Sequence, residues 1–575
     1  MTQPTPAIVT QSAVRRLPRL ALALFCLAYV LPGFLGREPW KTADVASLGA
    51  MLDLAQGLAS AWHPTVLGAP VDDMAWLPYW LGAVFITALP FLPPELAARL
   101  PFAGLLGLTL ACTWYATYHL ARHRAAQPVA FAFGGEAHPT DYARALADAG
   151  LLALLACLGL AQLSHETTPD VARLAFAGCL LWGAARLSHG EGLRQTWRGV
   201  ALWGLGTIGL ALSGAAGWGA VLAGGLLLWL VMPGRSLTGA PLGPMRGALL
   251  VGLWATLPLS WAILPGGSNG PITAFDAGSW AQLVVWFTWP AWPLALWTLW
   301  RWRRQAVAAH VALPLWSALV LVVVSALAPD DRDRALLPAL PALAVLAAFA
   351  LPTLRRSVSA LVDWFTLLFF TFCAVAIWVV WTAMQTGVPA KPAANVTKLA
   401  PGFVPEFSAG LFLLATLATA AWIGLVAWRV GRHRQALWKS LVLPAAGSTL
   451  CWLLLMTLWL PLLDFGRSYG PLSRRVATLV PPGSCVLVDG LNQAQIAALR
   501  HHGGLDLRRT PTPAGDCSTL IVAPAAQPTL DQRVTLTDWA FRATVRRLTD
   551  TKESVLVYQR IGAAAPAEVS PPPRP

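Results

Sequence analysis

Long apolar runs recur along the first 462 residues of the chain, and short polar segments separate them. Most runs have about 20 residues, and a helix of that length crosses the roughly 30 Å of hydrocarbon in a bilayer. They lie near 20–35, 98–120, 145–163, 171–187, 199–213, 215–232, 247–265, 280–300, 307–328, 335–352, 361–384, 407–428 and 441–462. This pattern predicts an all-α polytopic membrane protein with about 13 transmembrane helices.

A further apolar run, Leu77 to Pro94, contains prolines and is followed almost at once by the next run. If it does not cross, the N-terminus shares its side of the membrane with the Arg-bearing loops, as the positive-inside rule requires. Loops 164–170 and 266–279 on the other side then hold no Lys or Arg. If it does cross, every later loop changes side and the Arg-bearing loops fall on the outer face, against the positive-inside rule. We therefore expect 77–94 to be an interfacial helix or a re-entrant segment, with the N-terminus cytoplasmic and the C-terminus periplasmic.

The chain becomes less apolar after residue 463. We expect a transmembrane domain at 1–463 with a first outer loop at 37–97, an extracytoplasmic domain at 464–563 and a Pro-rich disordered tail at 564–575. Three short β-like runs and one intervening helical stretch predict that the extracytoplasmic domain is a small α/β unit. These elements are strands at Cys485–Val488, Leu520–Val522 and Ser554–Tyr558, and a helix at Gln493–His501.

Composition narrows the functional class. Only 12% of the residues are charged, about half the share in soluble proteins. The net charge of +14 comes from arginines dispersed between apolar runs, which is typical of cytoplasmic loops and argues against nucleic-acid binding. Arg15, Arg16 and Arg19 precede the first run without a cleavage motif, so we expect an uncleaved first span. Cys485 and Cys517 each adjoin a predicted strand on the oxidising side and are candidates for a disulfide.

Acidic and basic residues collect in the segments assigned to the periplasmic face. Carboxylates there could deprotonate a hydroxyl or amine acceptor, and arginines could clamp a phosphate. A lipid phosphate at the membrane interface fits both needs, although such residues can also be solvated acids and headgroup anchors. The candidates are Glu38, Lys41, Asp44 and Asp73 in the first loop, Glu166 and Asp170 in the SHETTPD turn, Arg332 and Arg334 in PDDRDR, and Arg467, Tyr469 and Arg474 in DFGRSYGPLSRR.

Several other chemistries lack support in the sequence. There is no Walker loop, no GxSxG motif with supporting context and no CxxC pair. The histidines have no metal-ligand spacing, so no metal site is predicted, and a divalent cation between carboxylates and phosphate stays an open alternative. Cytoplasmic nucleotide chemistry is therefore not supported.

Scattered motifs occur in a characteristic order along nearly the whole chain. A first span and an acid-bearing loop lead to WHPTVLGAP and then LPYWLGA, with DRALLPALPALAVLAA, DFGRSYGPL and AALRHHGGL further on. This order resembles the GT-C superfamily of polyprenyl-phosphate-dependent glycosyltransferases. It looks most like the branch that contains the bacterial 4-amino-4-deoxy-L-arabinose transferase of lipid A and the protein mannosyltransferases.

The resemblance implies an inverting transfer of a sugar from a polyprenyl phosphate to a lipid or glycan acceptor on the periplasmic face. By position, Asp44 matches the family's first-loop acid. Asp73 stands where the family usually has a Glu before Lys-Pro, seven positions before the Trp of the YW pair. Asp170, with Glu166 as a rival, matches the acid of the second outer turn. Met74 stands where the family has Lys, which leaves phosphate binding to Arg332, Arg334, Arg467 or Arg474. The sugar, the acceptor and the oligomeric state stay open.

Two other functional classes compete with the enzyme. A lipid-linked-sugar flippase or transporter predicts ionisable residues inside the spans, and few are found there. A non-catalytic envelope assembly protein could keep the architecture without activity, and the Met74 departure is compatible with it. A polymerase or ligase of surface polysaccharide would use the same kind of donor, so the sequence separates it poorly.

Overall fold

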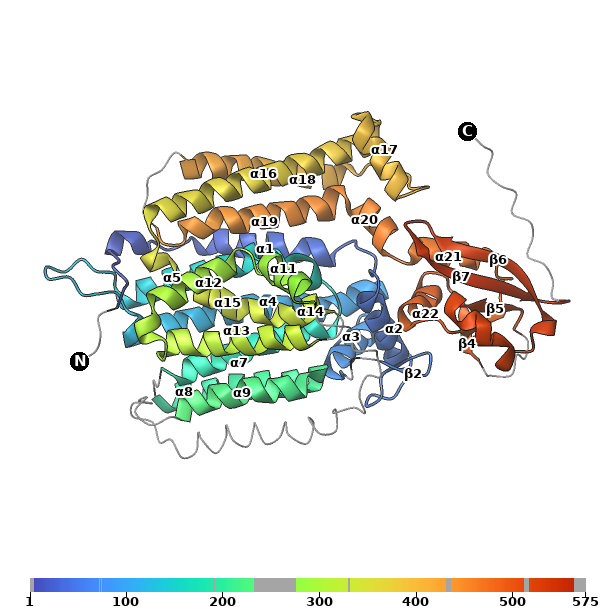
Figure 1. Ribbon diagram of the computed structural model, residues 1–575, viewed down its shortest axis with the longest axis horizontal. Helices are drawn as coiled ribbons and strands as arrows, with labels where there is room; N and C mark the ends of the chain where they lie inside the picture. The colour runs from blue at the N-terminus through green and yellow to red at the C-terminus, as the bar shows by residue number, and fades with distance from the viewer. Residues whose placement is uncertain are drawn as a thin grey trace.

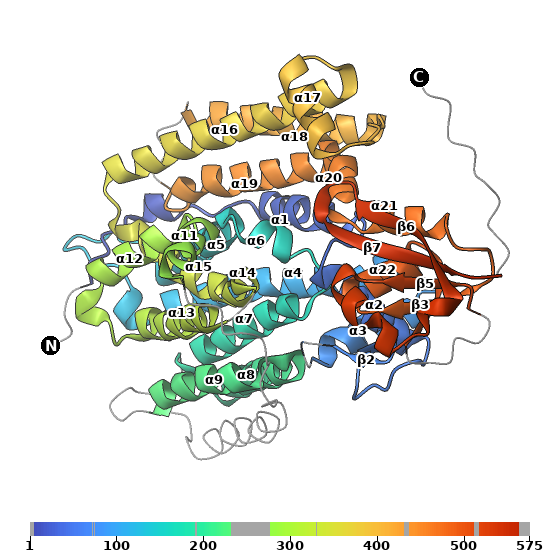
Figure 2. The ribbon, with the colours of Figure 1, turned by 45° about the vertical axis from the view of Figure 1, so that its right-hand side comes forward.

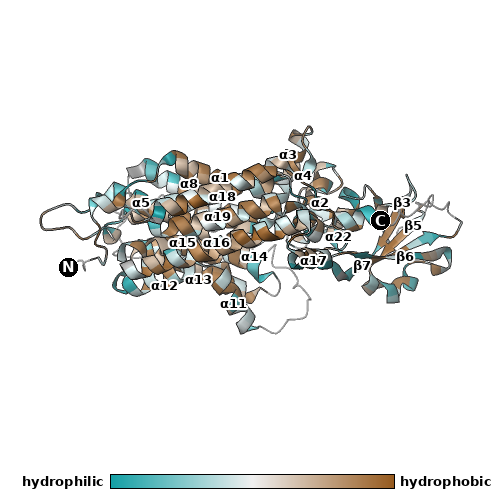
Figure 3. Ribbon diagram, turned by 90° about the horizontal axis from the view of Figure 1, so that it is seen from above, coloured by the Kyte–Doolittle hydropathy of each residue, from teal (hydrophilic) through white to brown (hydrophobic). Residues whose placement is uncertain are grey.

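The computed structural model describes residues 5–71, 73, 75–189, 192–231, 276–328, 331–430, 436–510 and 517–562. Within them, helices form an elongated bundle, and the C-terminal strands form a sheet at one end of it (Figures 1 and 2). Asp72, Met74, the predicted span at 247–265 and the tail at 564–575 lie outside the described residues. Hydrophobic residues cover the middle of the bundle helices, whereas hydrophilic ones gather at its ends and around the sheet (Figure 3).

Most of the long helices follow the predicted apolar runs, and shorter helices such as α2, α17 and α21 lie outside them. Their bounds are α1 (Arg19–Phe34), α2 (Ala43–Ala55), α3 (Leu77–Ala88), α4 (Pro94–Ala121), α5 (Pro139–Ala156), α6 (Leu160–Leu163), α7 (Pro169–Leu187), α8 (Gly192–Leu210), α9 (Ala216–Val231), α11 (Ala277–Phe287), α12 (Ala291–Arg301), α13 (Ala309–Leu327), α14 (Arg332–Leu336), α15 (Leu340–Ala348), α16 (Arg356–Thr386), α17 (Ala390–Leu399), α18 (Ala409–Val430), α19 (Lys439–Leu458), α20 (Leu460–Arg467) and α21 (Gly470–Ala477).

Seven helical segments among the described residues are long and apolar enough to cross a membrane. One of them, Arg194–Val231, covers two predicted runs. The chain turns back on itself there at Gly214, whose φ of +75° is a left-handed conformation that glycine adopts without strain. The chain is thus a multi-pass protein, and the full count of about 13 spans stays a prediction.

Two of the predicted spans, 145–163 and 280–300, are broken helices, so the expectation of one continuous helix over each was wrong. The chain leaves the helix after α5 and resumes at α6, and it leaves α11 and resumes at α12, where Pro290 lacks an N–H group. Backbone groups freed at the two breaks form hydrogen bonds with each other. The Gly159 N–H donates to the Phe287 carbonyl at 2.9 Å, and the Leu158 N–H donates to the Trp289 carbonyl at 3.1 Å. Such pairing is required where no water can solvate the backbone.

Helix α3 covers most of the run whose crossing was uncertain. Its 12 residues make a helix of about 18 Å, well short of the roughly 30 Å of a bilayer core. It lies beside α2 and α4 at the sheet end of the bundle (Figure 1). The described helix is therefore too short to cross, as the charge pattern predicted.

Five strands form one mixed sheet in the order β4-β3-β5-β7-β6. Strand β3 is parallel to its neighbours β4 and β5, and β7 is antiparallel to β5 and β6. The three predicted strands and the predicted helix coincide with β3, β5, β7 and α22, and Cys485 and Cys517 form a disulfide between the start of β3 and the residues before β5. The bounds are β3 (Cys485–Asp489), α22 (Gln493–His501), β4 (Asp506–Arg509), β5 (Thr519–Val522), β6 (Trp539–Arg547) and β7 (Asp550–Arg560).

The first loop lies between the bundle and the sheet. Helix α22 packs on α2 so closely that a Cβ atom on Gly49 would meet the Cβ of Ala497. Asp53 pairs with Arg500, and Arg509 donates to the Leu67 carbonyl at 2.9 Å, next to the small hairpin of β1 (Thr65–Val66) and β2 (Ala69–Pro70). These contacts fix the first loop, and with it the acids that it carries.

Candidate functional site

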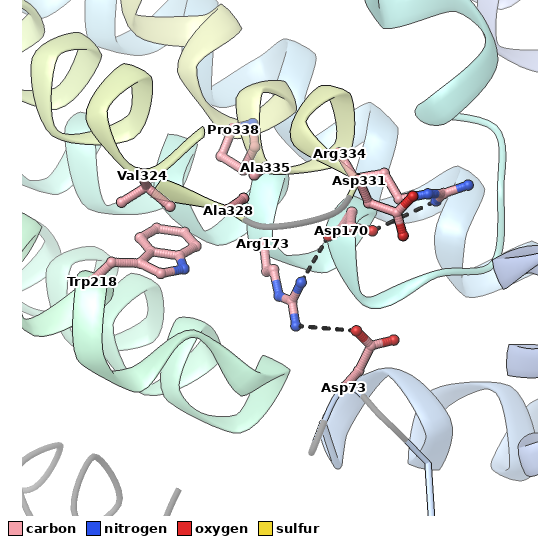
Figure 4. A pocket seen from close by; sticks show the side chains of 10 residues that line it. All are labelled: Asp73, Asp170, Arg173, Trp218, Val324, Ala328, Asp331, Arg334, Ala335 and Pro338. Carbon is pink, nitrogen blue, oxygen red and sulfur yellow. Dashed lines mark hydrogen bonds and ion pairs between the residues drawn. The ribbon is translucent and has the colours of Figure 1, made fainter. Parts of the chain in front are cut away.

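A cavity of about 230 Å³ lies at the sheet end of the bundle, where the ends of α7, α9, α13 and α14 meet the first loop (Figure 4). One part of its wall is charged and another is apolar. The charged residues are Asp73, Asp170, Arg173, Asp331 and Arg334, and the apolar ones are Trp218, Val324, Ala328, Ala335 and Pro338. The cavity can therefore accommodate a charged group together with an apolar one.

The charged wall is a chain of alternating carboxylates and guanidiniums. Asp170 contacts Arg173 at 2.8 Å and Arg334 at 3.6 Å, so its carboxylate joins the two arginines. Arg173 reaches Asp73 at 3.9 Å on one side, and Arg334 reaches Glu166 at 2.6 Å on the other. Three of the predicted residues, Asp73, Asp170 and Arg334, thus line the cavity, and Glu166 is joined to them behind its wall through Arg334.

Local sequence explains how Asp170 and Arg173 come together. Helix α7 begins with Pro169, which is favoured in the first turn because its ring presets φ and it lacks an N–H group. Asp170 lies in that first turn, where the positive end of the helix dipole stabilises a carboxylate. Arg173 follows three residues later and hence lies on the same face of the helix.

Asp44 lies outside the residues that line the cavity. It is 1% exposed, and its carboxylate accepts hydrogen bonds from the Arg37 guanidinium at 2.9 Å, the Trp40 N–H at 3.2 Å, and the N–H and hydroxyl of Thr167, both at 2.8 Å. Burial alone would raise the pKa of Asp44, but Arg37, Arg99 and Thr167 outweigh it and hold the pKa below its ordinary value. Asp44 is therefore a buried anion, and its hydrogen bonds with Thr167 fix the turn that carries Glu166.

Trp40 links the first loop to the segment before the sheet. The guanidiniums of Arg37 and Arg467 both lie over its ring, at 4.6 Å and 5.3 Å from the ring centroid, an arrangement that favours the cations. Its indole N–H donates to the Asp464 carboxylate at 2.7 Å. Burial is the main cause that raises the pKa of Asp464 to about 6.

The raised pKa of Asp464 predicts a pH dependence of stability. The folded protein holds this proton more tightly than the unfolded chain, whose carboxyl has the ordinary pKa of 3.8. The tighter proton binding therefore stabilises the folded protein fully below pH 3.8, and this stabilisation is lost as the pH rises through about 6. We expect an Asp464→Asn variant to gain thermal stability relative to wild type between pH 4 and pH 7, measured as Tm in detergent. Parallel Tm curves for the two proteins would contradict this expectation.

The remaining predicted site residues are not among those that line the cavity. Arg332 donates to the Ala328 carbonyl at 3.1 Å, and Arg467 to the Gln162 side chain at 2.5 Å. Arg474 pairs with Glu38 at 3.4 Å. Lys41 and Tyr469 both contact Glu553 of β7, at 3.2 Å and 3.3 Å, and so tie the sheet to the bundle.

Sequence reasoning missed several residues around the site. Arg173 lines the cavity, Arg37 pairs with Asp44, and Arg99 donates to the Arg37 carbonyl. Arg173 could have been found from its spacing, because it lies one helical turn after Asp170. Among the described residues, no three His, Cys, Asp or Glu side chains converge closely enough to hold a metal ion.

No family model matches the chain, and no curated protein matches its sequence. Two solved structures match its fold. One is ArnT from Cupriavidus metallidurans in the apo state, with a TM-score of 0.63, 13% identity, and coverage of 94% of this chain and 97% of that one. The other is the same enzyme bound to undecaprenyl phosphate, with a TM-score of 0.62, 14% identity, and coverage of 95% and 99%. The chain thus has, over nearly its full length, the fold of ArnT, a 4-amino-4-deoxy-L-arabinose lipid A transferase of the GT-C type.

Proposed function

We propose that this chain is an integral membrane glycosyltransferase that moves a sugar from a polyprenyl-phosphate donor to a lipid A-like lipid or another cell-envelope acceptor. The observation that carries the proposal is the cavity, because its charged wall and its apolar wall face the same space. A polyprenyl-phosphate sugar has the same division into a charged, polar head and an apolar chain. The fold shared with ArnT, which one solved structure contains bound to undecaprenyl phosphate, supports the same ligand class.

The proposed chemistry is an inverting displacement at the anomeric carbon of the sugar. The acceptor oxygen forms the new bond to that carbon as the bond to the phosphate oxygen breaks, and the acceptor proton passes to a carboxylate. Asp73 is the candidate for this proton, because it lines the cavity and its side chain is 45% exposed. Polyprenyl phosphate leaves with the electron pair of the broken bond.

Other residues of the cavity are proposed to support this step. Arg334 stabilises the negative charge that develops on the departing phosphate, because guanidinium groups placed in advance interact most strongly with developing charge. Asp170 holds Arg334 and Arg173 in position, and Asp44 acts one layer further out by fixing the turn that carries Glu166. Asp44 is thus a positioning residue in this proposal.

We also propose that the site faces the periplasm of a bacterial inner membrane. Arg301, Arg303 and Arg304 lie at and just after the end of α12, in the connection to α13. That connection lies at the end of the bundle away from the sheet, near the N-terminus (Figure 1). The positive-inside rule then assigns that end to the cytoplasm and the cavity to the periplasmic face.

The flippase alternative calls for a path of ionisable groups through the middle of the bundle. Two of the carboxylates in the described long helices are held by partners instead: the Asp148 carboxylate accepts from the Trp114 indole at 2.9 Å, and Asp363 pairs with Arg429. No observation favours this alternative or the non-catalytic one over the enzyme.

A transfer assay tests the proposal. Purified wild-type protein in detergent receives radiolabelled polyprenyl-phosphate sugars and a total membrane-lipid extract, and the Asp73→Asn variant serves as the control. Label that moves to a lipid or glycan with wild type, and at least about 100-fold more slowly with the variant, is the expected result. Donor binding without transfer of any sugar would instead favour the non-catalytic or transport alternatives.

A further inference from the structure

Arg173 is held in place from two sides before any ligand arrives. Its Nε donates to the Ser213 carbonyl at 2.8 Å, and one terminal nitrogen contacts the Asp170 carboxylate at 2.8 Å. The side chain is only 16% exposed. A guanidinium fixed in this way loses little conformational entropy when it binds a further group.

The second terminal nitrogen of Arg173 faces the cavity. It reaches Asp73 at 3.9 Å, which is longer than the 2.7–3.2 Å of a direct hydrogen bond. A Cβ atom on Gly214 would meet the Asp73 backbone carbonyl first and would lie 3.0 Å from this nitrogen, so Gly214 lets the Asp73 backbone pack close to Arg173. An oxyanion could therefore take this donor edge without breaking a short contact (Figure 4).

Arg334 is the other arginine that lines the cavity. One of its terminal nitrogens contacts Glu166 at 2.6 Å, and the other lies 3.6 Å from Asp170 and makes no hydrogen bond, so Arg334 can share the phosphate with Arg173. Arg332, Arg467 and Arg474 are not among the residues that line the cavity. Arg173 also lies between the charged residues and the apolar residues Trp218 and Val324 in the close view (Figure 4).

We propose that Arg173 is a phosphate ligand of the lipid-linked donor, and that the phosphate binds by displacing Asp73. This inference rests on the proposed function and assigns a residue to its donor site. A phosphate on the open edge of Arg173 places the first part of the lipid chain next to Trp218 and Val324.

Binding of decaprenyl phosphate and of neutral decaprenol to the protein in nanodiscs tests the assignment. Arg173→Gln is expected to weaken decaprenyl phosphate binding by about 10- to 100-fold and to leave decaprenol binding within about twofold, because only a charge-assisted hydrogen bond is removed. Arg173→Lys should recover part of the affinity, since it restores the charge without the planar fork. Arg186→Gln, at the other end of α7, is the matched control and should bind both lipids like wild type.

The Asp73→Asn variant gives a second measurement that does not disturb a buried group. If phosphate and Asp73 compete for Arg173, removing the carboxylate charge should tighten decaprenyl phosphate binding by about three- to tenfold. Unchanged phosphate affinity in both Arg173→Gln and Asp73→Asn, with wild type still binding, would overturn the Arg173 assignment and leave the proposed function standing. Absence of decaprenyl phosphate binding by wild type would overturn both.

Discussion

Replacement of Asp170 by Asn is expected to slow sugar transfer by about 100- to 1,000-fold while the protein stays folded. The variant keeps the shape of the side chain but removes the charge that joins Arg173 and Arg334, at 2.8 Å and 3.6 Å. Both guanidiniums then lose their shared anchor in the wall of the cavity. The measurement is the initial rate of transfer from a radiolabelled polyprenyl-phosphate sugar at saturating acceptor, together with Tm in the same detergent.

Asp141→Asn is the matched control for this experiment. Asp141 also lies in the first turn of a helix, α5, and pairs with an arginine, Arg16, at 2.7 Å, but the arginine is 59% exposed and the pair is far from the cavity residues in the bundle. Its removal should leave the transfer rate within about twofold of wild type, because exposed ion pairs contribute little. Equal rates for wild type and Asp170→Asn would exclude the proposed anchoring role.

The second large effect is expected in stability, from Asp44→Asn. This change leaves the Arg37 guanidinium, whose side chain is 1% exposed, without its counter-charge. Breaking a buried ion pair by removing one partner costs about 3–5 kcal/mol. We therefore expect a clearly lower Tm in detergent, followed by intrinsic tryptophan fluorescence, and a loss of transfer that follows from displacement of the turn at Thr167.

A double variant separates the charge effect from a general packing defect. Arg37→Gln combined with Asp44→Asn makes both partners neutral, so it should recover a large part of the stability that the single change loses. Asp141→Asn should again leave Tm almost unchanged. A single Asp44→Asn variant as stable as wild type, or a double variant no better than the single one, would show that this ion pair does not hold the loop in place.

The sequence predicted the helices and strands well, because their signals are local. A run of apolar residues of membrane length predicts a helix wherever it occurs, and the short β-rich runs at Cys485–Val488 and Leu520–Val522 became strands β3 and β5. Strands β4 and β6 were not predicted. Their exposed and charged residues, as in Asp506–Arg509, obscure the pattern that a buried strand would have.

Assignment of the site from sequence was less complete. The acids at Asp73, Asp170 and Glu166 do converge, together with Arg334, but the sequence could not show that Asp44 is buried beneath them. It also passed over Arg173, because an arginine near the end of a span is usually a headgroup anchor. Whether such a residue contacts lipid or lines a cavity depends on the neighbouring helices, and these are distant in the chain.

The sequence by itself therefore determined that the chain is a multi-pass helical protein, which segments are apolar enough to enter a membrane and on which side its charges concentrate. These properties depend on composition and on spacing over about 20 residues. Only the tertiary structure decided where α5 and α11 break, because each break needs hydrogen-bond partners from the other helix. It also decided which charges share the cavity, because ion pairs such as Glu166–Arg334 join residues more than a hundred positions apart, and burial strengthens them only once the bundle has excluded water.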